Sequence, residues 1–185
     1  MPRRLPLLAL LPLLRMTALP LARDLALTTR AALPDDIPAM VALMAPYIAT
    51  GDLLPRTPGD LERDIGQYVV ACERGGAVVG MGALKPYTAG LAEVIAIAVH
   101  ARAQGRGVGQ AIVEYLVRRA AELGFHEVFA LTRVAGFFHR LGFTTVEKGR
   151  FPLKVWFDCA RCARLHCCDE IAVHVTGVAS RRPPT

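Results

Sequence analysis

Residues 94–109 read VIAIAVHARAQGRGVG, and this stretch decides the fold of the chain. Its first six residues are all apolar and at least half are β-branched, which predicts a buried strand. The alternating glycines that follow leave backbone N–H groups uncovered and allow a sharp turn. An amphipathic run over 110–123, ending before Gly124, predicts a helix. A strand, a glycine loop and a helix N-terminus in this order form a cradle for a phosphate, because free amides and the positive helix end face one point.

The spacing of the glycines narrows the kind of phosphate ligand. It matches neither GxxxxGK[ST] nor GxGxxG, and no acidic residue follows in a second parallel βαβ unit, so nucleoside triphosphates and dinucleotides are disfavoured. The pattern Gln-x-x-Gly-x-Gly after a strand instead resembles the pyrophosphate loop of the GNAT superfamily of N-acetyltransferases, which hold acetyl-CoA there. An ordinary glycine-rich turn in an α/β protein is the alternative.

The resemblance implies that acetyl-CoA binds along the strand, the glycine loop and the start of the helix. The strand backbone at 97–99 would then supply the hydrogen bond that polarises the thioester. The residues expected to bind the cofactor are Ile97, Ala98, Val99, Gln104, Gly105, Arg106, Gly107, Val108, Gly109, Gln110 and Phe138.

Composition predicts one globular domain, over 25–178, with a substantial core. The chain has 185 residues, of which 53% are hydrophobic. Its formal charge of +6 comes from nineteen Arg and three Lys against 16 acidic residues. This charge suits an acidic small ligand such as CoA or a dicarboxylate. The arginines are scattered and lack interleaved aromatics, so nucleic acid is not an expected partner.

The two ends of the chain are expected to lie outside the domain. Residues 1–15 resemble a short secretory signal, but their apolar stretch contains Pro6 and Pro12 and they end on Arg15 rather than on a small-residue cleavage site. The apolar stretch is also far below the ~20 residues of a membrane span, so no membrane partner is expected. We therefore interpret 1–24 as an extension or a mis-assigned start, disordered, in a cytoplasmic protein that begins near Met16. Residues 179–185 are expected to be a disordered tail.

Periodicity and turn signals predict the order βααβββαβαββ, an α/β layout with a mixed central sheet flanked by helices. Asp35 or Asp36 is expected to cap a first helix that Pro46 ends. A capping signal at Thr57 starts the second helix. Gly80 and Gly82 indicate a bulge or a close backbone approach within a strand.

Further segments strengthen and narrow the resemblance. Residues 137–143, FFHRLGF, are similar to the second GNAT landmark, a short helix and turn beside the CoA arm. Several weaker motifs in one order look like the N-acetylglutamate synthase family, in its stand-alone bacterial form; they lie at 51–57, 83–87, 92–94, 129–132 and 151–156. This likeness implies an acetyl-CoA-dependent amino-acid N-acetyltransferase that acts on L-glutamate, the first step of arginine synthesis. It also suggests a possible homodimer.

Acetyl transfer requires a base for the amine, a donor to the thioester carbonyl and a proton for the leaving thiolate. The resemblance implies that Glu93 is the general base, through a water. In the alternative interpretation, Glu93 caps the strand at a solvated edge. Many relatives use a tyrosine in the short helix as the general acid. Phe138 stands at that position here and cannot donate a proton. Thr132 is the candidate replacement, as an acid or as a hydrogen-bond donor.

A substrate with two carboxylates needs fixed cations. The candidates are Arg56, Lys85 and Lys154, each in a family-like segment; for each, solvated surface charge is the alternative. In related two-domain enzymes an Arg and a Ser near the last strand also touch substrate. Here that region reads Cys-Asp-Glu at 168–170, so the contact does not transfer and the amino-acid preference is open.

Four of the five cysteines gather in one short segment, with Cys159 and Cys162 at knuckle spacing and Cys167 and Cys168 adjacent. They predict a structural zinc site in which His166 competes with Cys167 for the fourth place. A redox-sensitive thiol cluster and free cysteines in a tight turn are the alternatives.

Two other functions stay open. The same fold would serve for acetylation of another small amine, another amino acid or a peptide N-terminus. A CoA-binding regulatory module without turnover is the third possibility.

Overall fold

The computed structural model describes residues 27–152 and 167–178. Its elements follow the predicted order of strands and helices. They are β1 (Thr28–Ala31), α1 (Ile37–Ala49), α2 (Pro58–Arg63), β2 (Tyr68–Cys72), β3 (Val78–Pro86), β4 (Leu91–Val99), α3 (Val108–Glu122), β5 (Glu127–Thr132), α4 (Ala135–Arg140), β6 (Thr144–Val146) and β7 (Ile171–Thr176). Among the described helices, none combines the length and the apolar character that crossing a bilayer requires.

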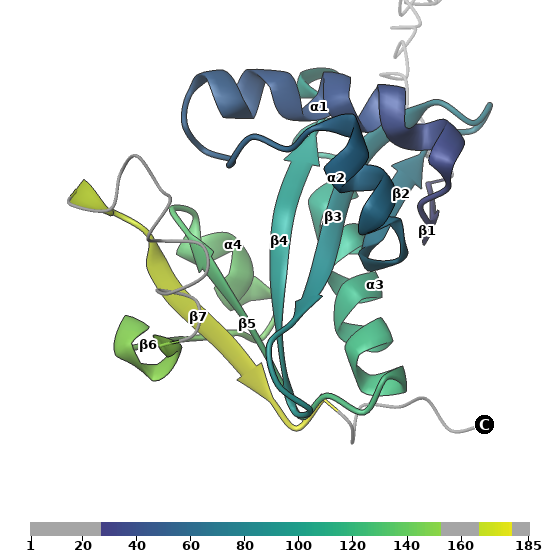
Figure 1. The fold of residues 1–185 in the computed structure, drawn as a ribbon. Helices are drawn as coiled ribbons and strands as arrows, with labels where there is room; N and C mark the ends of the chain where they lie inside the picture. Colours follow the sequence, from purple (N-terminus) through teal and green to yellow (C-terminus); the bar gives the residue numbers. More distant parts are fainter. Residues whose placement is uncertain (1–26, 153–166, 179–185) are drawn as a thin grey trace, which may run out of the picture.

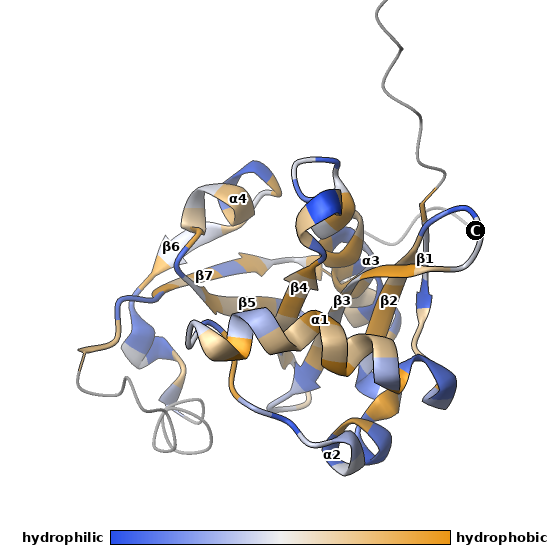
Figure 2. Ribbon diagram, turned by 90° about the horizontal axis from the view of Figure 1, so that it is seen from above, coloured by the Kyte–Doolittle hydropathy of each residue, from blue (hydrophilic) through white to orange (hydrophobic). Residues whose placement is uncertain are grey.

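The strands form one seven-stranded sheet in the order β1-β2-β3-β4-β5-β7-β6. All neighbouring pairs are antiparallel except β4 and β5, which are parallel. Helices α1 and α2 cover one face of the sheet, and α3 and α4 cover the other (Figure 2). The predicted mixed α/β fold is therefore confirmed.

Strands β4 and β5 stay paired over a short distance only. Residues 91–93 lie opposite 127–129, and beyond Glu93 no further pairs follow. In Figure 1 the two strands lie side by side at one end and diverge toward the other. The second half of β4 therefore keeps β3 as its neighbour and has an open edge toward β5.

A β-bulge shapes the same part of β4. Ala98 pairs with Met81 and Ile95 pairs with Ala83, so two β4 residues, at 96 and 97, oppose the single residue between them on β3. Ala96 adopts a φ of 54°, a left-handed conformation that is uncommon for a residue with a side chain. A bulge increases the local twist and bends the strand, which favours its separation from β5.

The residue opposite the bulge is Gly82, and its lack of a side chain lets α3 approach the sheet. A Cβ placed there would lie 2.6 Å from Ile97 Cδ1 and 2.7 Å from Ile112 Cγ2. At Gly80 it would lie 2.6 Å from Val108 Cγ1. The close approach predicted for these glycines is confirmed, and it places the start of α3 against the end of β4.

Two boundaries differ from the sequence prediction. Helix α1 continues through Pro46 to Ala49, because a proline in the last turn removes only one internal hydrogen bond. Asp36 does not cap α1 with its side chain. Its carboxylate instead accepts the Leu33 N–H at 2.8 Å and binds both Arg30 Nη atoms, and this guanidinium lowers the pKa of Asp36. By contrast, the Thr57 capping box of α2 is formed as predicted.

Replacing Gly82 with alanine tests the packing of α3 on the sheet. The added methyl group overlaps buried side chains, so Gly82→Ala should lower the free energy of unfolding by about 1–3 kcal/mol. Urea denaturation followed by circular dichroism measures the change. Gly66→Ala is the matched control, since a Cβ at Gly66 meets nothing within 4 Å. Equal stability of the two variants would contradict the close approach.

Candidate active site

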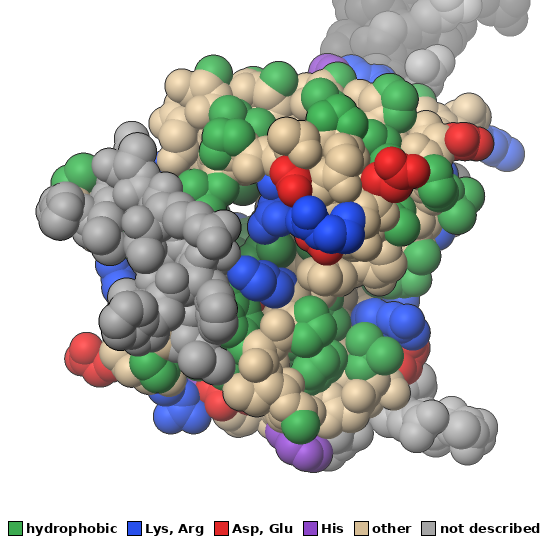
Figure 3. Space-filling view, in the orientation of Figure 1, with side chains coloured by type: hydrophobic (Ala, Val, Ile, Leu, Met, Phe, Trp, Pro, Cys, Tyr) green, Lys and Arg blue, Asp and Glu red, His purple; other side chains and the backbone are tan. Residues whose placement is uncertain are grey.

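A cavity of about 410 Å³ lies where β4 and β5 diverge. Its walls come from the loop after α1, the second half of β4, the end of β5, the start of α4 and the segment before β7. On the face shown in Figure 3, basic and acidic side chains gather around a hollow. The lining residues include Tyr47, Asp52, Arg56, Glu93, Ile97, Thr132, Arg133, Phe138, Cys168 and Glu170.

Glu93 lies at the point where the two strands separate. It is the last β4 residue paired with β5, opposite Phe129, and only 1% of its surface is exposed. The Tyr87 hydroxyl donates a hydrogen bond to Glu93 Oε2 at 3.0 Å. The interpretation of Glu93 as a cap on a solvated edge is wrong, because β4 begins at Leu91 and has strands on both sides at Glu93. The carboxylate is a buried group on the wall of a cavity.

Lys85 belongs to the surroundings of Glu93 and is not among the described residues that line the cavity. It pairs with Glu93 across β3 and β4, and its Nζ lies 5.0 Å from the centroid of the Tyr87 ring. Tyr87 was not singled out from the sequence. Its place in the Ala83–Tyr87 segment, two residues after Lys85, was the available signal.

Thr132 and Phe138 also reach the cavity. Thr132 is the last residue of β5, and its Oγ1 accepts the Val134 N–H at 3.0 Å. This acceptor role leaves the hydroxyl proton available for donation. Phe138 is buried among aromatic rings, with its centroid 5.1 Å from Phe137 and 5.2 Å from Phe143. It contributes an apolar wall and no proton.

The glycine loop forms the predicted helix N-terminus. Gly105 and Gly107 have φ values of 72° and 79°, and Gly107 is the N-cap of α3. Because a glycine cap carries no side chain, the first-turn amides of this 15-residue helix have no capping acceptor. They and the positive end of the helix suit a phosphate. Arg106 is exposed beside them.

Several predicted cofactor residues have side chains that are already engaged. Val108 is 1% exposed and packs into the core, so only its backbone N–H can reach a ligand. The side chain of Ala98 is fully buried on the α1 face. Gln110 Nε2 donates to Glu114 Oε1 at 2.9 Å. Gly109 lies close to Phe137, because a Cβ placed at this glycine would be 3.4 Å from the Cζ of that ring.

The open edge of β4 is partly occupied by a tyrosine from α1. The Tyr47 hydroxyl donates to Val99 O at 2.7 Å, accepts from Val99 N at 3.2 Å, and accepts from Gln104 Nε2 at 3.0 Å. It therefore joins two of the predicted cofactor residues, and it was missed because a tyrosine in an amphipathic helix gives no separate signal.

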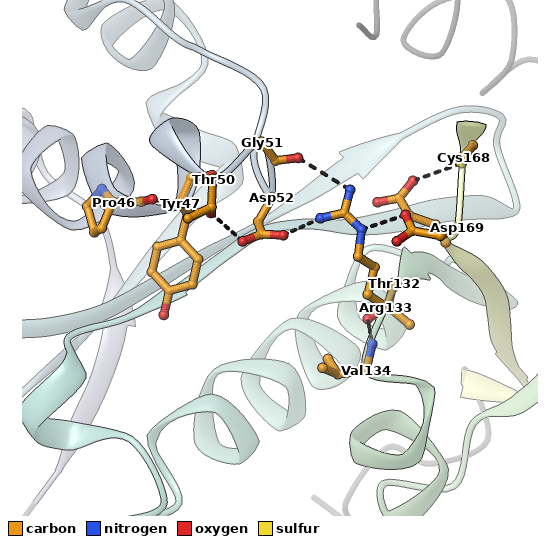
Figure 4. A network of polar contacts seen from close by, with 11 residues as sticks. Pro46, Tyr47, Thr50, Gly51, Asp52, Thr132, Arg133, Val134, Cys168 and Asp169 are labelled. Atoms are coloured by element: carbon orange, nitrogen blue, oxygen red, sulfur yellow. Dashed lines mark hydrogen bonds and ion pairs between the residues drawn. The ribbon is translucent and has the colours of Figure 1, made fainter. Parts of the chain in front are cut away.

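Arg56 and Arg133 are the guanidinium groups on the cavity wall in the described part of the chain. Arg56 is half-buried in the loop that leads to α2. Arg133 directly follows β5 and binds acidic residues from two other segments (Figure 4). The pKa of Arg133 is raised, mainly by the hydrogen bond that it donates to Asp169. Sequence reasoning missed Arg133, although its position after a buried strand was a signal.

The predicted zinc site falls largely outside the described residues. Cys159 and Cys162 lie there, as does the substrate candidate Lys154. Cys168 lies on the cavity wall, with its Sγ 3.4 Å from Lys148 Nζ, and Cys167 is exposed. Within 27–152 and 167–178, no group of three or more potential ligands converges on one point.

Diverging parallel strands beside a glycine-capped helix, with a buried carboxylate between them, define the class of acetyl-CoA-dependent N-acetyltransferases. Residues 40–143 match the acetyltransferase (GNAT) family, and the chain belongs to this family.

Its curated relatives include proteins of similar length and much longer ones. The chain is 36% identical over 138 residues to an uncharacterized N-acetyltransferase of Chlorobaculum tepidum, over 75% of this chain and 88% of that protein. It is 37% identical over 141 residues to the amino-acid acetyltransferase of Mycobacterium tuberculosis, a match that covers 75% of this chain and 80% of that protein. It is 33% identical to the amino-acid acetyltransferase of Pasteurella multocida over 69% of this chain, but the match spans only 29% of that protein.

Solved structures agree with this assignment. A Mycobacterium tuberculosis protein in complex with CoA superimposes with a TM-score of 0.72 at 28% identity, covering 80% of this chain and 98% of that one. The N-acetylglutamate synthase of Neisseria gonorrhoeae, complexed with coenzyme A and N-acetyl-glutamate, superimposes with a TM-score of 0.73 at 26% identity. This match covers 84% of this chain and 36% of that one. The protein is thus an acetyl-CoA-dependent N-acetyltransferase of GNAT type.

Substitution of Gly107 tests the amide cradle. Gly107→Ala forces a side chain into a left-handed conformation, at a cost of about 1–2 kcal/mol, and the loop should shift to relieve it. We expect the Kd for CoA, measured by calorimetry, to rise by about tenfold. Gly124→Ala is the control, since Gly124 has a φ of 84° at the other end of α3. An unchanged CoA affinity in Gly107→Ala would contradict the cradle.

Proposed function

We propose that the protein transfers the acetyl group of acetyl-CoA to the α-amine of L-glutamate. Glu93 and Arg56 line the same cavity at the separation of β4 and β5, and this arrangement carries the proposal. A base for the amine and a fork-shaped cation for a carboxylate are the two groups that an amino-acid acceptor requires. The names of the relatives in Mycobacterium tuberculosis and Neisseria gonorrhoeae support the same acceptor class.

In the proposed mechanism, the residues of the cavity share the proton transfers. Glu93 takes a proton from the substrate ammonium, through a water, and the free amine attacks the thioester carbonyl carbon. A backbone N–H at the open edge of β4, within 97–99, stabilises the charge that develops on the carbonyl oxygen; at Val99 this N–H would first have to leave the Tyr47 hydroxyl. As the C–S bond breaks, the attacking nitrogen loses its second proton to solvent and Thr132 donates a hydrogen bond to the departing sulfur; the thiolate finally takes a proton from solvent.

The hydrogen bond from Tyr87 gives Glu93 a fixed orientation. In the proposed mechanism, the carboxylate held by this donor is the group that accepts the substrate proton. Lys85 lies over the Tyr87 ring and adds positive charge next to Glu93. We assign it to the positioning of Glu93 rather than to direct substrate binding. Lys154 stays a substrate-binding candidate from the sequence alone.

An amino acid with an uncharged side chain is the second candidate acceptor. The described lining residues include three carboxylates, Asp52, Glu93 and Glu170, against two guanidinium groups. Because Arg133 already binds acidic residues, Arg56 is the cation that the described part of the lining offers to a substrate α-carboxylate. A second substrate carboxylate would need another cation or donor, either near Glu170 on the cavity wall or among the residues outside the described part.

A comparison of acceptors distinguishes the two candidates. Thiol release from acetyl-CoA is followed with L-glutamate, L-glutamine, other amino acids and a peptide with a free N-terminus, each against a no-acceptor control. The highest kcat/KM with L-glutamate supports the first proposal. A preference for L-glutamine, which has the same shape without the charge, supports the second. Tight CoA binding without any turnover would instead select a regulatory module.

Glu93→Gln tests the proposed base. The amide keeps the shape and a hydrogen-bonding oxygen for Tyr87 but cannot accept the substrate proton. Because a general base contributes roughly 10²–10⁴-fold, kcat should fall at least about 100-fold while the Kd for CoA stays constant. Glu114→Gln, on the exposed side of α3, is the matched control. Full activity of Glu93→Gln would refute the assignment.

Arg56→Gln tests the proposed carboxylate partner. A charge-assisted pair with a substrate carboxylate contributes about 1.5–3 kcal/mol, so KM for the amino acid should rise roughly tenfold or more. The KM for acetyl-CoA should not change. Arg63→Gln, which removes an exposed arginine of α2 paired with Asp60 and Asp64, serves as the control. Equal increases in both KM values would count against a direct role in amino-acid binding.

A further inference from the structure

We propose that Arg133 is a positioning residue, which holds the substrate loop at 51–56 and the segment at 168–170 together across the mouth of the cavity. This inference rests on the proposed function, since it assigns a role in binding an amino acid. It also predicts which acceptors depend on Arg133, because the residue neutralises acidic groups beside the substrate.

Arg133 reaches three partners from two separate segments (Figure 4). Its Nε donates to Asp169 Oδ1 at 2.7 Å, its Nη1 pairs with Asp52 Oδ1, and its Nη2 lies 3.4 Å from Gly51 O. A planar guanidinium carries five N–H donors on three nitrogens, which suits it to bind two carboxylates and a carbonyl in different directions at once. We call these four residues the Arg133 clasp.

Asp52 connects the Arg133 clasp to the loop that carries Arg56. Its N–H donates to Tyr47 O at 2.8 Å, and the Thr50 hydroxyl binds its carboxylate, so Asp52 is fixed to the end of α1. At the far end of the loop, the Thr57 capping box fixes the start of α2. Arg56 therefore lies on a short span that is held at both ends, and the clasp attaches one of these ends to β5.

The clasp also sets the charge that the substrate meets. Arg133 and Asp52 line the cavity together with Arg56, Glu93 and Glu170. Loss of the guanidinium would leave Asp52 uncompensated, four residues from Arg56 and on the same wall. Its negative charge would then compete with the substrate α-carboxylate for Arg56 and would also repel a second carboxylate on the side chain of the substrate. An acceptor with two carboxylates should suffer more from this loss than one with a single carboxylate.

Solvent access limits the strength of each pair. The Arg133 side chain is 26% exposed, and those of Asp52 and Asp169 are 45% and 57% exposed. Pairs of this kind are modest and are screened by salt, so the clasp should be readily opened. This suits a mouth that must admit substrate and release product.

The kinetic test compares Arg133→Gln with Arg119→Gln, which removes an exposed ion pair on α3. We expect Arg133→Gln to raise KM for L-glutamate about fivefold, the size that two partly exposed pairs support, and KM for L-glutamine by less. The KM for acetyl-CoA and the melting temperature should stay at the Arg119→Gln values. Arg133→Lys should recover only part of the effect, because the single nitrogen of an ammonium group replaces three guanidinium nitrogens that each contact a different partner. Equal changes in both substrates' KM values, or full rescue by lysine, would overturn the proposal.

Coupling between the partners gives a second test. Asp52→Asn and Asp169→Asn should each raise KM for the amino acid in the wild-type background. When Arg133 is already glutamine, Asp169→Asn should not change KM further, whereas Asp52→Asn should lower it again by removing the uncompensated charge beside Arg56; residues that share one partner are not additive. Fully additive effects would show that the two aspartates act independently of Arg133.

Hydrogen exchange tests the clasp without any substrate. The Asp52 and Leu53 amides, both bonded to Tyr47 O at 2.8 and 3.2 Å, should exchange at least about threefold faster in Arg133→Gln, with α3 unchanged. Unchanged exchange would refute the clasp, and faster exchange with normal KM values would refute its role in positioning. If no amino acid is acetylated, the proposed function fails. The positioning role is then judged by exchange and by the KM of whichever amine the panel identifies.

Discussion

The loss of pairing between β4 and β5 after Glu93 is the constraint on which the site depends. A strand in the middle of a sheet normally has both its edges hydrogen-bonded, and its backbone is then closed to ligands. Here the second half of β4 keeps only β3, so its other edge must find partners elsewhere. The Tyr47 hydroxyl takes both polar groups of Val99. An extended acyl-CoA arm presents the same kind of donors and acceptors, and in the proposed mechanism it binds this edge as an added strand would.

Small residues keep the strand edge and the helix N-terminus in one place. Without side chains at Gly80 and Gly82, Val108 and Ile112 pack directly on β3, and the start of α3 lies against the end of β4. The bulge at 96 and 97 lies opposite Gly82, so the close packing and the bend in β4 share one position. The phosphate cradle and the open edge are therefore consequences of the same contacts, and a substitution there would disturb both.

Local signals predicted the elements well, because they act over a few residues. Thr57 caps α2, and Gly124 follows α3 in the left-handed conformation that its position requires. The helix end predicted at Pro46 was wrong, because a proline near the end of a helix removes only one hydrogen bond and the helix continues to Ala49. The clasp could not be predicted at all: Arg133 and Asp52 are 81 residues apart, and only the folded sheet brings them together. The same reason hid the Tyr47 contact with Val99.

The net charge of the chain is a poor guide to the charge of this cavity. Its arginines give the protein a formal charge of +6, but the described cavity wall carries more carboxylates than guanidinium groups. What a substrate meets depends on which charges are already paired. Arg133 is bound to Asp52 and Asp169. In the proposed mechanism, Glu93 must stay able to accept a proton. Under the proposed function, acceptor choice therefore depends on the local charge balance around Arg56 and Glu170, which both line the cavity, rather than on the net charge of the chain.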